Sequence, residues 1–315
     1  MTQTPIAPPA AGSASAPRNS SLASSSGRSR IAAYVALTKP RIIELLLVTT
    51  LPAMILAAEG LPKAWVVVAT LVGGTLAAGS ANALNCYVDR DIDALMRRTG
   101  HRPLATNDVS PTGALIFGAS LGVGSVALMS VATNWLAGVL TAVAIVFYVV
   151  VYTMVLKRRT AQNIVWGGAA GCMPVLIGWA AVTGSLTWTP VLMFLVVFFW
   201  TPPHFWALAI KYRDDYARAN VPMLPVVAPV TRVAREIVAY SWLTVAASLA
   251  IWPLATGWLY PILAGLAGLA LLFAAHRLRA RARAGHDPQP MQLFHLSNSY
   301  LAFVFLAIAV DVFVR

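Results

Sequence analysis

Three acidic residues and an amide lie close together in the stretch ALNCYVDRDIDALMRRTGHRPL, residues 83–104. Asn85, Asp89 and Asp93 are spaced four residues apart, so on a continuing α-helix their side chains fall within an arc of about 80°. Stacked carboxylates repel each other, and a divalent cation removes that penalty. We therefore predict that these three residues bind Mg²⁺ together with a diphosphate.

The remaining acid of this stretch, Asp91, would lie on the opposite helix face, where Arg90 or Arg98 could neutralise it. A solvated helix end is the simpler explanation for charged residues here. It does not account for two carboxylates stacked one turn beyond an asparagine. Asp91 is therefore expected to tolerate substitution better than its acidic neighbours.

A second acidic pair ends the stretch WTPPHFWALAIKYRDD, residues 200–215. Asp214 and Asp215 are the predicted second metal-binding group. Helical spacing places His204, Lys211 and Asp215 on nearly one face, with His204 inside the bilayer. Polar residues at that depth are functional candidates, although packing against a neighbouring helix is the alternative for His204.

Two prolines and several cations surround these acids. Pro202 and Pro203 are expected to break or kink the helix just before His204. Lys157, in YTMVLKRRTAQN (152–163), either serves membrane topology or supplies a counter-charge to a leaving diphosphate, whereas Arg159 is assigned to topology. Further candidate cations on the diphosphate side are Arg41, Arg97 and Lys211, and Glu44 could line the same cavity.

The elements that must position these groups are membrane-spanning helices. The 315 residues are 58% hydrophobic and 11% charged, with a mean hydropathy of +0.71, which is too apolar for a soluble domain. Since a span needs roughly 20 apolar residues, we expect an all-α integral membrane protein with nine helices, at residues 43–59, 64–86, 112–132, 136–156, 163–182, 188–210, 236–255, 258–276 and 295–314.

The distribution of basic residues predicts the orientation of these spans. With a cytoplasmic N-terminus, every Lys and Arg except Lys63 and Arg315 lies on the inner side, as the positive-inside rule requires. The two loops that carry most of the acids, residues 87–111 and 211–235, then open on that face, and we call them the first and second acidic loops. The net charge of +12 is explained by topology and does not indicate nucleic-acid binding, because the cations are spread over several loops.

The N-terminal residues and the cysteines have simpler interpretations. Residues 1–36 are predicted to form a disordered cytoplasmic tail before a membrane domain at 37–315, because the start of the chain is rich in Ser, Ala and Pro. Its prolines argue against a mitochondrial targeting helix, so we expect the bacterial inner membrane rather than the mitochondrial one. Cys86 and Cys172 lack metal or disulfide spacing and are expected to pack in the core.

Two Asp clusters, Mg²⁺ and converging cations suit a substrate with a diphosphate head and a long hydrocarbon tail. Loss of the diphosphate leaves an allylic carbocation for an electron-rich acceptor, which is prenyl transfer. A secondary transporter is the alternative from another class, but transporters place ionisable groups near the bilayer midplane. These acids instead cluster at one interface.

The pattern N-x-x-x-D-x-x-x-D at Asn85–Asp93, with an acidic loop after the sixth predicted span, resembles the UbiA superfamily of intramembrane prenyltransferases. LTKPRIIELLLVTT (37–50), DRDIDALMRRTGHRPL (89–104), LKRRTAQNIVWGGAAGCMPVLIGW (156–179) and DDYARANVPMLPVV (214–227) most resemble the branch that farnesylates protohaem IX. The second loop departs from the usual D-x-x-x-D, because Arg218 and Ala219 stand four residues after Asp214 and Asp215.

The resemblance implies that farnesyl diphosphate is ionised at the acidic loops and adds to a vinyl group of haem B, and that water then completes a hydroxyethylfarnesyl side chain. Lys157 and Asp215 would act on the diphosphate side, and His204 is a candidate for haem contact. The enzyme that carries the product on to haem A is a possible partner. The rival within the superfamily is transfer to an aromatic quinone precursor such as 4-hydroxybenzoate.

Overall fold

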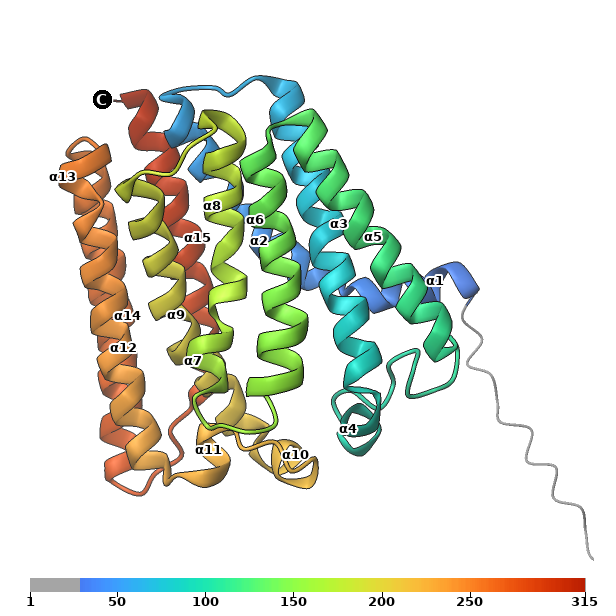
Figure 1. Cartoon of the computed structure of the whole chain (residues 1–315). Helices are drawn as coiled ribbons and strands as arrows, with labels where there is room; N and C mark the ends of the chain where they lie inside the picture. The colour runs from blue at the N-terminus through green and yellow to red at the C-terminus, as the bar shows by residue number, and fades with distance from the viewer. Residues whose placement is uncertain (1–28, 315) are drawn as a thin grey trace, which may run out of the picture.

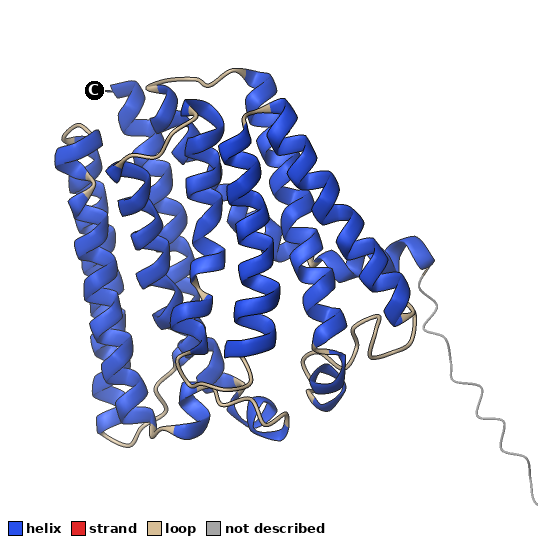
Figure 2. Cartoon of the chain, in the orientation of Figure 1, coloured by secondary structure: helices blue, strands red, loops and turns tan. Residues whose placement is uncertain are grey.

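Helices make up nearly all of the protein (Figures 1 and 2). The computed structural model describes residues 29–314, apart from the side chains of residues 41–47 and 255. That part contains no β-strand. Its helices are α1 (Arg30–Thr38), α2 (Pro40–Ala58), α3 (Ala64–Val88), α4 (Arg90–Leu95), α5 (Pro111–Ala132), α6 (Trp135–Val146), the π-helix η1 (Phe147–Leu156), α7 (Asn163–Gly167), α8 (Ala169–Thr183), α9 (Trp188–Lys211), α10 (Arg213–Arg218), α11 (Leu224–Val227), α12 (Val230–Ala250), α13 (Trp252–Ala255), α14 (Leu259–Arg283) and α15 (Pro290–Val314).

Eight helical segments of the described part are long and apolar enough to cross a membrane. They are α3, α5, α6 with η1, α7 with α8, α9, α12 with α13, α14 and α15. The multi-pass, all-helical architecture is therefore confirmed. The ninth expected span corresponds to α2, whose described side chains form a shorter apolar stretch, Val48–Ala58, so the count of nine stays a prediction.

The boundary expected at residue 36 differs from the structure. Helix α1 begins at Arg30, and the Ser29 hydroxyl caps it by accepting a hydrogen bond from Ala32 N at 3.2 Å. Ala33 and Leu37 are buried against Cys86 of α3. Residues 30–36 are therefore folded, because α1 has an apolar face that α3 covers.

Helix α9 departs from its expected shape in two ways. It continues through Pro202 and Pro203 without a break, although each proline removes a backbone donor. It then ends at Lys211, and α10 begins after Tyr212. Of the predicted break or kink at the prolines, the break is therefore wrong, since the helix ends only at Lys211.

Buried hydrogen bonds join α15 to its neighbouring helices near both of its ends. Near the C-terminus, Asp311 of α15 accepts the backbone N–H groups of Gly257 at 2.5 Å and Tyr260 at 2.9 Å, and so caps the start of α14. Nearer the start of α15, the carbonyl of Ser297 accepts a hydrogen bond from the indole N–H of Trp200 at 2.7 Å. These bonds fix α15 against α9 and α14.

Three short helices, α4, α10 and α11, lie at one end of the bundle. Figure 1 shows α4, α10 and α11 together at the end where α3 and α9 finish and where α14 turns into α15. Both acidic loops therefore open on the same face, as predicted. At the same end a close approach joins α7 to η1, because a Cβ on Gly167 would lie 2.1 Å from Cδ2 of Tyr152.

Candidate functional site

The first acidic cluster follows the helical spacing that its sequence predicts. Asp89 N donates to Asn85 O at 2.9 Å, and Asp93 N donates to Asp89 O at 2.8 Å, so the four-residue ladder continues across the junction of α3 and α4. Asn85 Nδ2 donates to Asp89 Oδ2 at 2.7 Å. All three residues are buried, with exposed fractions of 3% for Asn85, 0% for Asp89 and 3% for Asp93.

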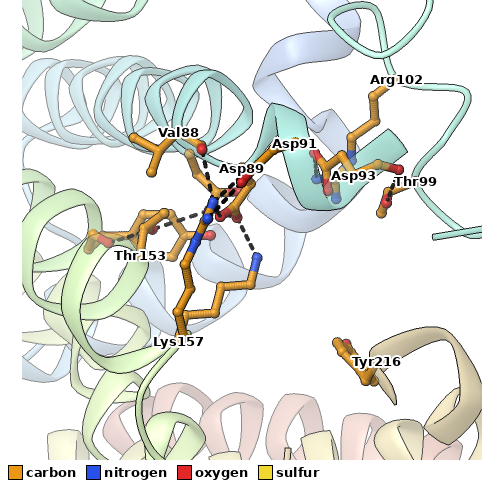
Figure 3. A network of polar contacts seen from close by, with 12 residues as sticks. Val88, Asp89, Asp91, Asp93, Thr99, Arg102, Thr153, Lys157 and Tyr216 are labelled. Atoms are coloured by element: carbon orange, nitrogen blue, oxygen red, sulfur yellow. Dashed lines mark hydrogen bonds and ion pairs between the residues drawn. The ribbon is translucent and has the colours of Figure 1, made fainter. Parts of the chain in front are cut away.

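The Asp89 carboxylate is buried, with a cation near each oxygen but hydrogen bonds to only one of them. Its Oδ2 pairs with Lys157 Nζ, which extends from the end of η1 (Figure 3). Its Oδ1 is buried, accepts no hydrogen bond and has Arg158 Nη2 at 3.6 Å. A buried carboxylate oxygen normally has a donor, so Oδ1 is a ligand position that the protein itself leaves open.

Asp91 lies apart from this cluster, as expected, with 59% of its side chain exposed. Its partner is Arg158, which donates two hydrogen bonds of 2.7 Å to the carboxylate. The expectation that Arg90 or Arg98 neutralises Asp91 is wrong, because Arg90 donates to the carbonyl of Tyr87. The hydrogen bonds from Arg158 lower the pKa of Asp91.

Asp93 is held by the loop that follows α4. Arg102 Nη1 lies 2.5 Å from Asp93 Oδ2, and the Thr99 hydroxyl donates to Asp93 O at 3.0 Å (Figure 3). The loop therefore folds back over the end of its own helix. It supplies a second buried carboxylate with a second cation.

The π-helix η1 connects Asn85 with Lys157. Within η1 the Thr153 hydroxyl donates to the carbonyl of Tyr148, five residues earlier, at 2.8 Å and accepts from Asn85 Nδ2 at 3.1 Å. Lys157 N also bonds five residues back, to Tyr152 O at 2.9 Å. Such i→i+5 bonds are rare and often occur at functional sites. Here they set the direction in which Thr153 and Lys157 leave the helix.

Lys39 supplies a third cation from the turn between α1 and α2. Its backbone is left-handed, with φ 54°, and its Nζ donates to Asn85 Oδ1 at 2.8 Å. Burial, together with nearby Arg102 and Lys157, lowers the pKa of Lys39 to about 8. A bound anion would favour the charged form of Lys39.

The two acids of the second loop differ in their burial. Asp215 is 7% exposed, accepts a hydrogen bond from Arg98 N at 3.3 Å and pairs with Arg218. Asp214 is exposed. Only Asp215 therefore faces the first acidic loop, which makes it the better candidate for a second metal-binding carboxylate.

Arg98 joins the two acidic loops. Its guanidinium lies 5.8 Å from the ring centre of Tyr212 and 5.9 Å from that of Tyr216, and Nη2 donates to the Tyr216 hydroxyl at 3.4 Å. Its Nε is buried and has no hydrogen-bond acceptor in the described part of the chain. Arg98 therefore fixes the distance between the loops and keeps one donor unused.

Two of the predicted diphosphate-side cations do not converge on this cluster in the structure. Arg97 is exposed, and Lys211 is exposed with Nζ 5.6 Å from the ring centre of Tyr212. The predicted single face through His204, Lys211 and Asp215 is wrong, because the helix ends at Lys211. The side chains of Arg41 and Glu44 lie outside the described residues.

His204 is buried in a ring stack inside the bundle. Its ring lies between Trp200 and Phe294, with centroid distances of 4.3 Å on each side. The Ser297 hydroxyl donates to Phe294 O at 2.8 Å, so the contact of 2.9 Å between His204 Nδ1 and Ser297 Oγ requires Nδ1 to donate. The unprotonated nitrogen of His204 is then Nε2.

Several residues of the site were missed from the sequence: Lys39, Arg98, Arg102, Thr153 and Arg158. Thr153 gave the clearest signal, since it is a hydroxyl in an apolar run four residues before Lys157. The arginines resemble ordinary topology charges, and their partners are far away along the chain. Cys86 and Cys172 are free and buried, which confirms their expected packing role.

The donor set fits a hard cation that also binds substrate. In the described residues, no three acidic, histidine or cysteine side chains come together as a metal site. Asn85, Asp89 and Asp93 nonetheless offer oxygen ligands, and Asp89 Oδ1 lacks a donor. Mg²⁺ prefers this arrangement of one or two carboxylates with phosphate oxygens and water. The residues therefore fit Mg²⁺ that arrives with a diphosphate.

The chain is similar to known proteins over most of its length. Protoheme IX farnesyltransferase 1 of Saccharopolyspora erythraea is 63% identical over 284 residues, which cover 90% of this chain and 91% of the relative. Protoheme IX farnesyltransferase of a Nocardioides species is 57% identical over 303 residues, covering 95% and 96%. The similarity thus extends through nearly the whole of both relatives.

Solved structures share the fold at low sequence identity. A digeranylgeranylglyceryl phosphate synthase has a TM-score of 0.75 at 16% identity, with 91% of this chain and 99% of the other covered. A UbiA homologue from Archaeoglobus fulgidus, bound to DMAPP and Mg²⁺, has a TM-score of 0.67 at 17% identity, with 88% and 99% covered. The UbiA prenyltransferase family matches residues 46–298, and this chain therefore belongs to that family.

Proposed function

We propose that this protein transfers the farnesyl group of farnesyl diphosphate to a vinyl group of haem B and so produces haem O. The observation that carries the diphosphate half of the proposal is the buried Asp89 carboxylate. It has Lys157 on one oxygen and no hydrogen-bond donor on the other. A carboxylate left in that state suits a site completed by a metal–diphosphate complex.

The side chains around Asp89 have distinct proposed roles. Asn85, Asp89 and Asp93 would hold Mg²⁺ from one loop, and Asp215 would belong to the second metal-binding group in the other. When bound, Mg²⁺ neutralises the diphosphate as a leaving group. Lys157 forms an ion pair with Asp89, and Arg102 forms one with Asp93. The two cations bring positive charge to the place where the leaving oxygen becomes negative. Arg98 positions the second loop next to the first through its bonds to Asp215 and Tyr216.

The haem acceptor is supported by the names of relatives that are 57–63% identical to this chain. His204 is the proposed haem contact, since Ser297 uses Nδ1 and leaves the Nε2 lone pair for iron. Contact with a propionate would instead require a proton on Nε2. If a His204→Ala protein keeps full haem affinity and turnover, His204 serves packing between Trp200 and Phe294 only.

The membrane setting completes the proposal. We propose nine spans with α2 as the first, a cytoplasmic N-terminus and cytoplasmic acidic loops in a bacterial inner membrane. The charge distribution along the sequence supports this orientation. The downstream enzyme that makes haem A remains a proposed partner.

Product analysis tests the reaction. The purified protein is supplied with haem B, farnesyl diphosphate and Mg²⁺, and extracted haem is analysed by mass. We expect a porphyrin heavier by one farnesyl group and one hydroxyl group, since a proton is released when water adds. Parallel reactions contain 4-hydroxybenzoate instead of haem, or lack Mg²⁺. Unchanged haem from folded protein, or prenylation of 4-hydroxybenzoate alone, contradicts the proposal.

A further inference from the structure

Two adjacent hollows lie where the chain passes from α14 into α15, at the same end of the bundle as the acidic loops. One has a volume of about 190 Å³ between α14 and α15, and the other about 460 Å³ beside the end of α9. They share Pro288, Gln289 and Gln292 as lining residues. Together they form one groove, which we call the α14–α15 groove.

The groove walls change from apolar to polar along both helices. On α14, Phe273, Arg277 and Arg281 are spaced four residues apart, so they follow one face toward the loop. On α15, Gln292 precedes Leu296 by four residues, so the polar side chain is again nearer the loop. This order matches a membrane lipid, with its headgroup at the loop and its hydrocarbon deeper in the bilayer.

The groove cations differ from those of the acidic loops. Among the described residues, neither Arg277 nor Arg281 has a carboxylate within ion-pair distance, although Arg281 Nε donates to Asp287 O at 2.6 Å. The Asp287 carboxylate is used locally, since it accepts from Gln289 N at 3.0 Å. Two guanidinium groups therefore line the groove without an anion.

A buried acceptor lies beside these cations. Gln289 Oε1 is buried and receives no hydrogen bond in the described part of the chain, and the residue has a left-handed backbone with φ 51°. Buried amide oxygens are normally satisfied. The groove thus offers positive charge for a phosphate together with an acceptor for a hydroxyl.

We propose that the α14–α15 groove binds an anionic phospholipid whose headgroup carries hydroxyls, as phosphatidylglycerol does. The phosphate pairs with Arg277 and Arg281, and a headgroup hydroxyl donates to Gln289 Oε1. An acyl chain lies against Phe273 and Leu296. This lipid site does not depend on the proposed haem farnesylation, because the residues proposed to bind the lipid lie on α14, α15 and the turn between them and not in the acidic loops.

Lipid binding to the full-length protein is the direct test. Delipidated protein is titrated with phosphatidylglycerol or phosphatidylcholine, and bound lipid is counted by native mass spectrometry. Each arginine near an anionic headgroup contributes about 1 kcal/mol, so we expect phosphatidylglycerol to bind roughly 30-fold more tightly than phosphatidylcholine. Arg277→Gln should reduce that preference about fivefold.

Two further variants separate a specific site from general charge attraction. Arg283→Gln removes an exposed arginine of the same helix that does not line the groove, and should leave binding unchanged. Leu296→Trp keeps every charge but fills the apolar end of the groove, and should weaken binding. Equal effects of Arg277→Gln and Arg283→Gln, or no effect of Leu296→Trp, overturn the proposal.

The source of the phosphate group is tested by competition. Millimolar inorganic phosphate should not displace phosphatidylglycerol, because it lacks the acyl chain that the apolar wall contacts. Displacement by phosphate alone identifies a small-anion site instead and contradicts lipid binding.

Discussion

The two acidic loops use carboxylates that are held in different ways. In the first loop, Asn85, Asp89 and Asp93 are ordered by the helix that carries them, since each is bonded to the group four residues away. In the second loop, Asp215 lies on a short separate helix and depends on Arg98 of the other loop. The first loop is therefore preformed, whereas the second takes its position from the first.

This difference ranks the consequences of changing each loop. Damage to the first loop should remove the chemistry. Damage to the second loop should weaken the closure of the site over the diphosphate. Four substitutions test this order, from the largest expected effect to the smallest.

Asp89→Asn should have the largest effect, a loss of roughly 10³-fold in farnesyl transfer, because it removes the central carboxylate and leaves Lys157 buried without its ion pair. Turnover with saturating Mg²⁺ is the measurement, and the unfolding midpoint checks that the protein is intact. Activity within tenfold of the unmodified protein would remove Asp89 from the centre of the site.

Asp215→Asn should reduce activity by about 10²-fold and raise the Mg²⁺ concentration needed for half-maximal rate. Asp214→Asn is the matched control, since Asp214 is exposed, and its activity should stay within about twofold because surface charges contribute little. Equal losses in both variants would show that the loop needs its total charge rather than one placed carboxylate.

Arg98→Gln should lower activity about tenfold, because it removes the hydrogen bond of the charged guanidinium to Tyr216 and its ring contacts, worth about 1.5 kcal/mol, while the backbone bond from Arg98 N to Asp215 remains. The loss should appear mainly in the Michaelis constant for farnesyl diphosphate, since Arg98 positions the second loop. Arg97→Gln, an exposed neighbour, is the control. A loss of turnover alone, with binding intact, would contradict a positioning role.

Asp91→Asn should have the smallest effect, with activity within about twofold and stability lower by about 0.5 kcal/mol, as for other exposed ion pairs. Because Arg158 lowers the pKa of Asp91, its stabilisation exists above the ordinary pKa of the carboxyl. It disappears as the pH falls through the lowered pKa. Unfolding midpoints of both proteins should therefore converge in acid, and a constant difference would exclude the ion pair.

Local patterns could be predicted from the sequence, and contacts between distant segments could not. The apolar runs predicted the spans, and four-residue spacing predicted the contact between Asn85 and Asp89. The same spacing failed for His204, Lys211 and Asp215, because helix continuity was assumed past Tyr212. Helix ends depend on tertiary contacts that a periodic pattern does not contain.

The partners of charged residues were the least predictable part of the site. Asp91 pairs with Arg158, 67 positions away, and Asp215 with the backbone of Arg98, 117 positions away. From the sequence, the expected partner of a charged residue is one nearby in the chain. In the folded bundle, loops that are distant in the sequence come together and supply the partners. The π-helix η1 was also missed, because its residues are as apolar as those of an α-helix.

The π-helix makes the position of Lys157 sensitive to chain length. Each residue of an α-helix turns the chain by about 100°, so deleting one residue within Phe147–Leu156 would rotate Lys157 away from Asp89 if α6 keeps its packing. Side-chain substitutions in η1 leave that register intact. A single deletion in this segment should therefore break the ion pair between Lys157 and Asp89, although it removes no charged group.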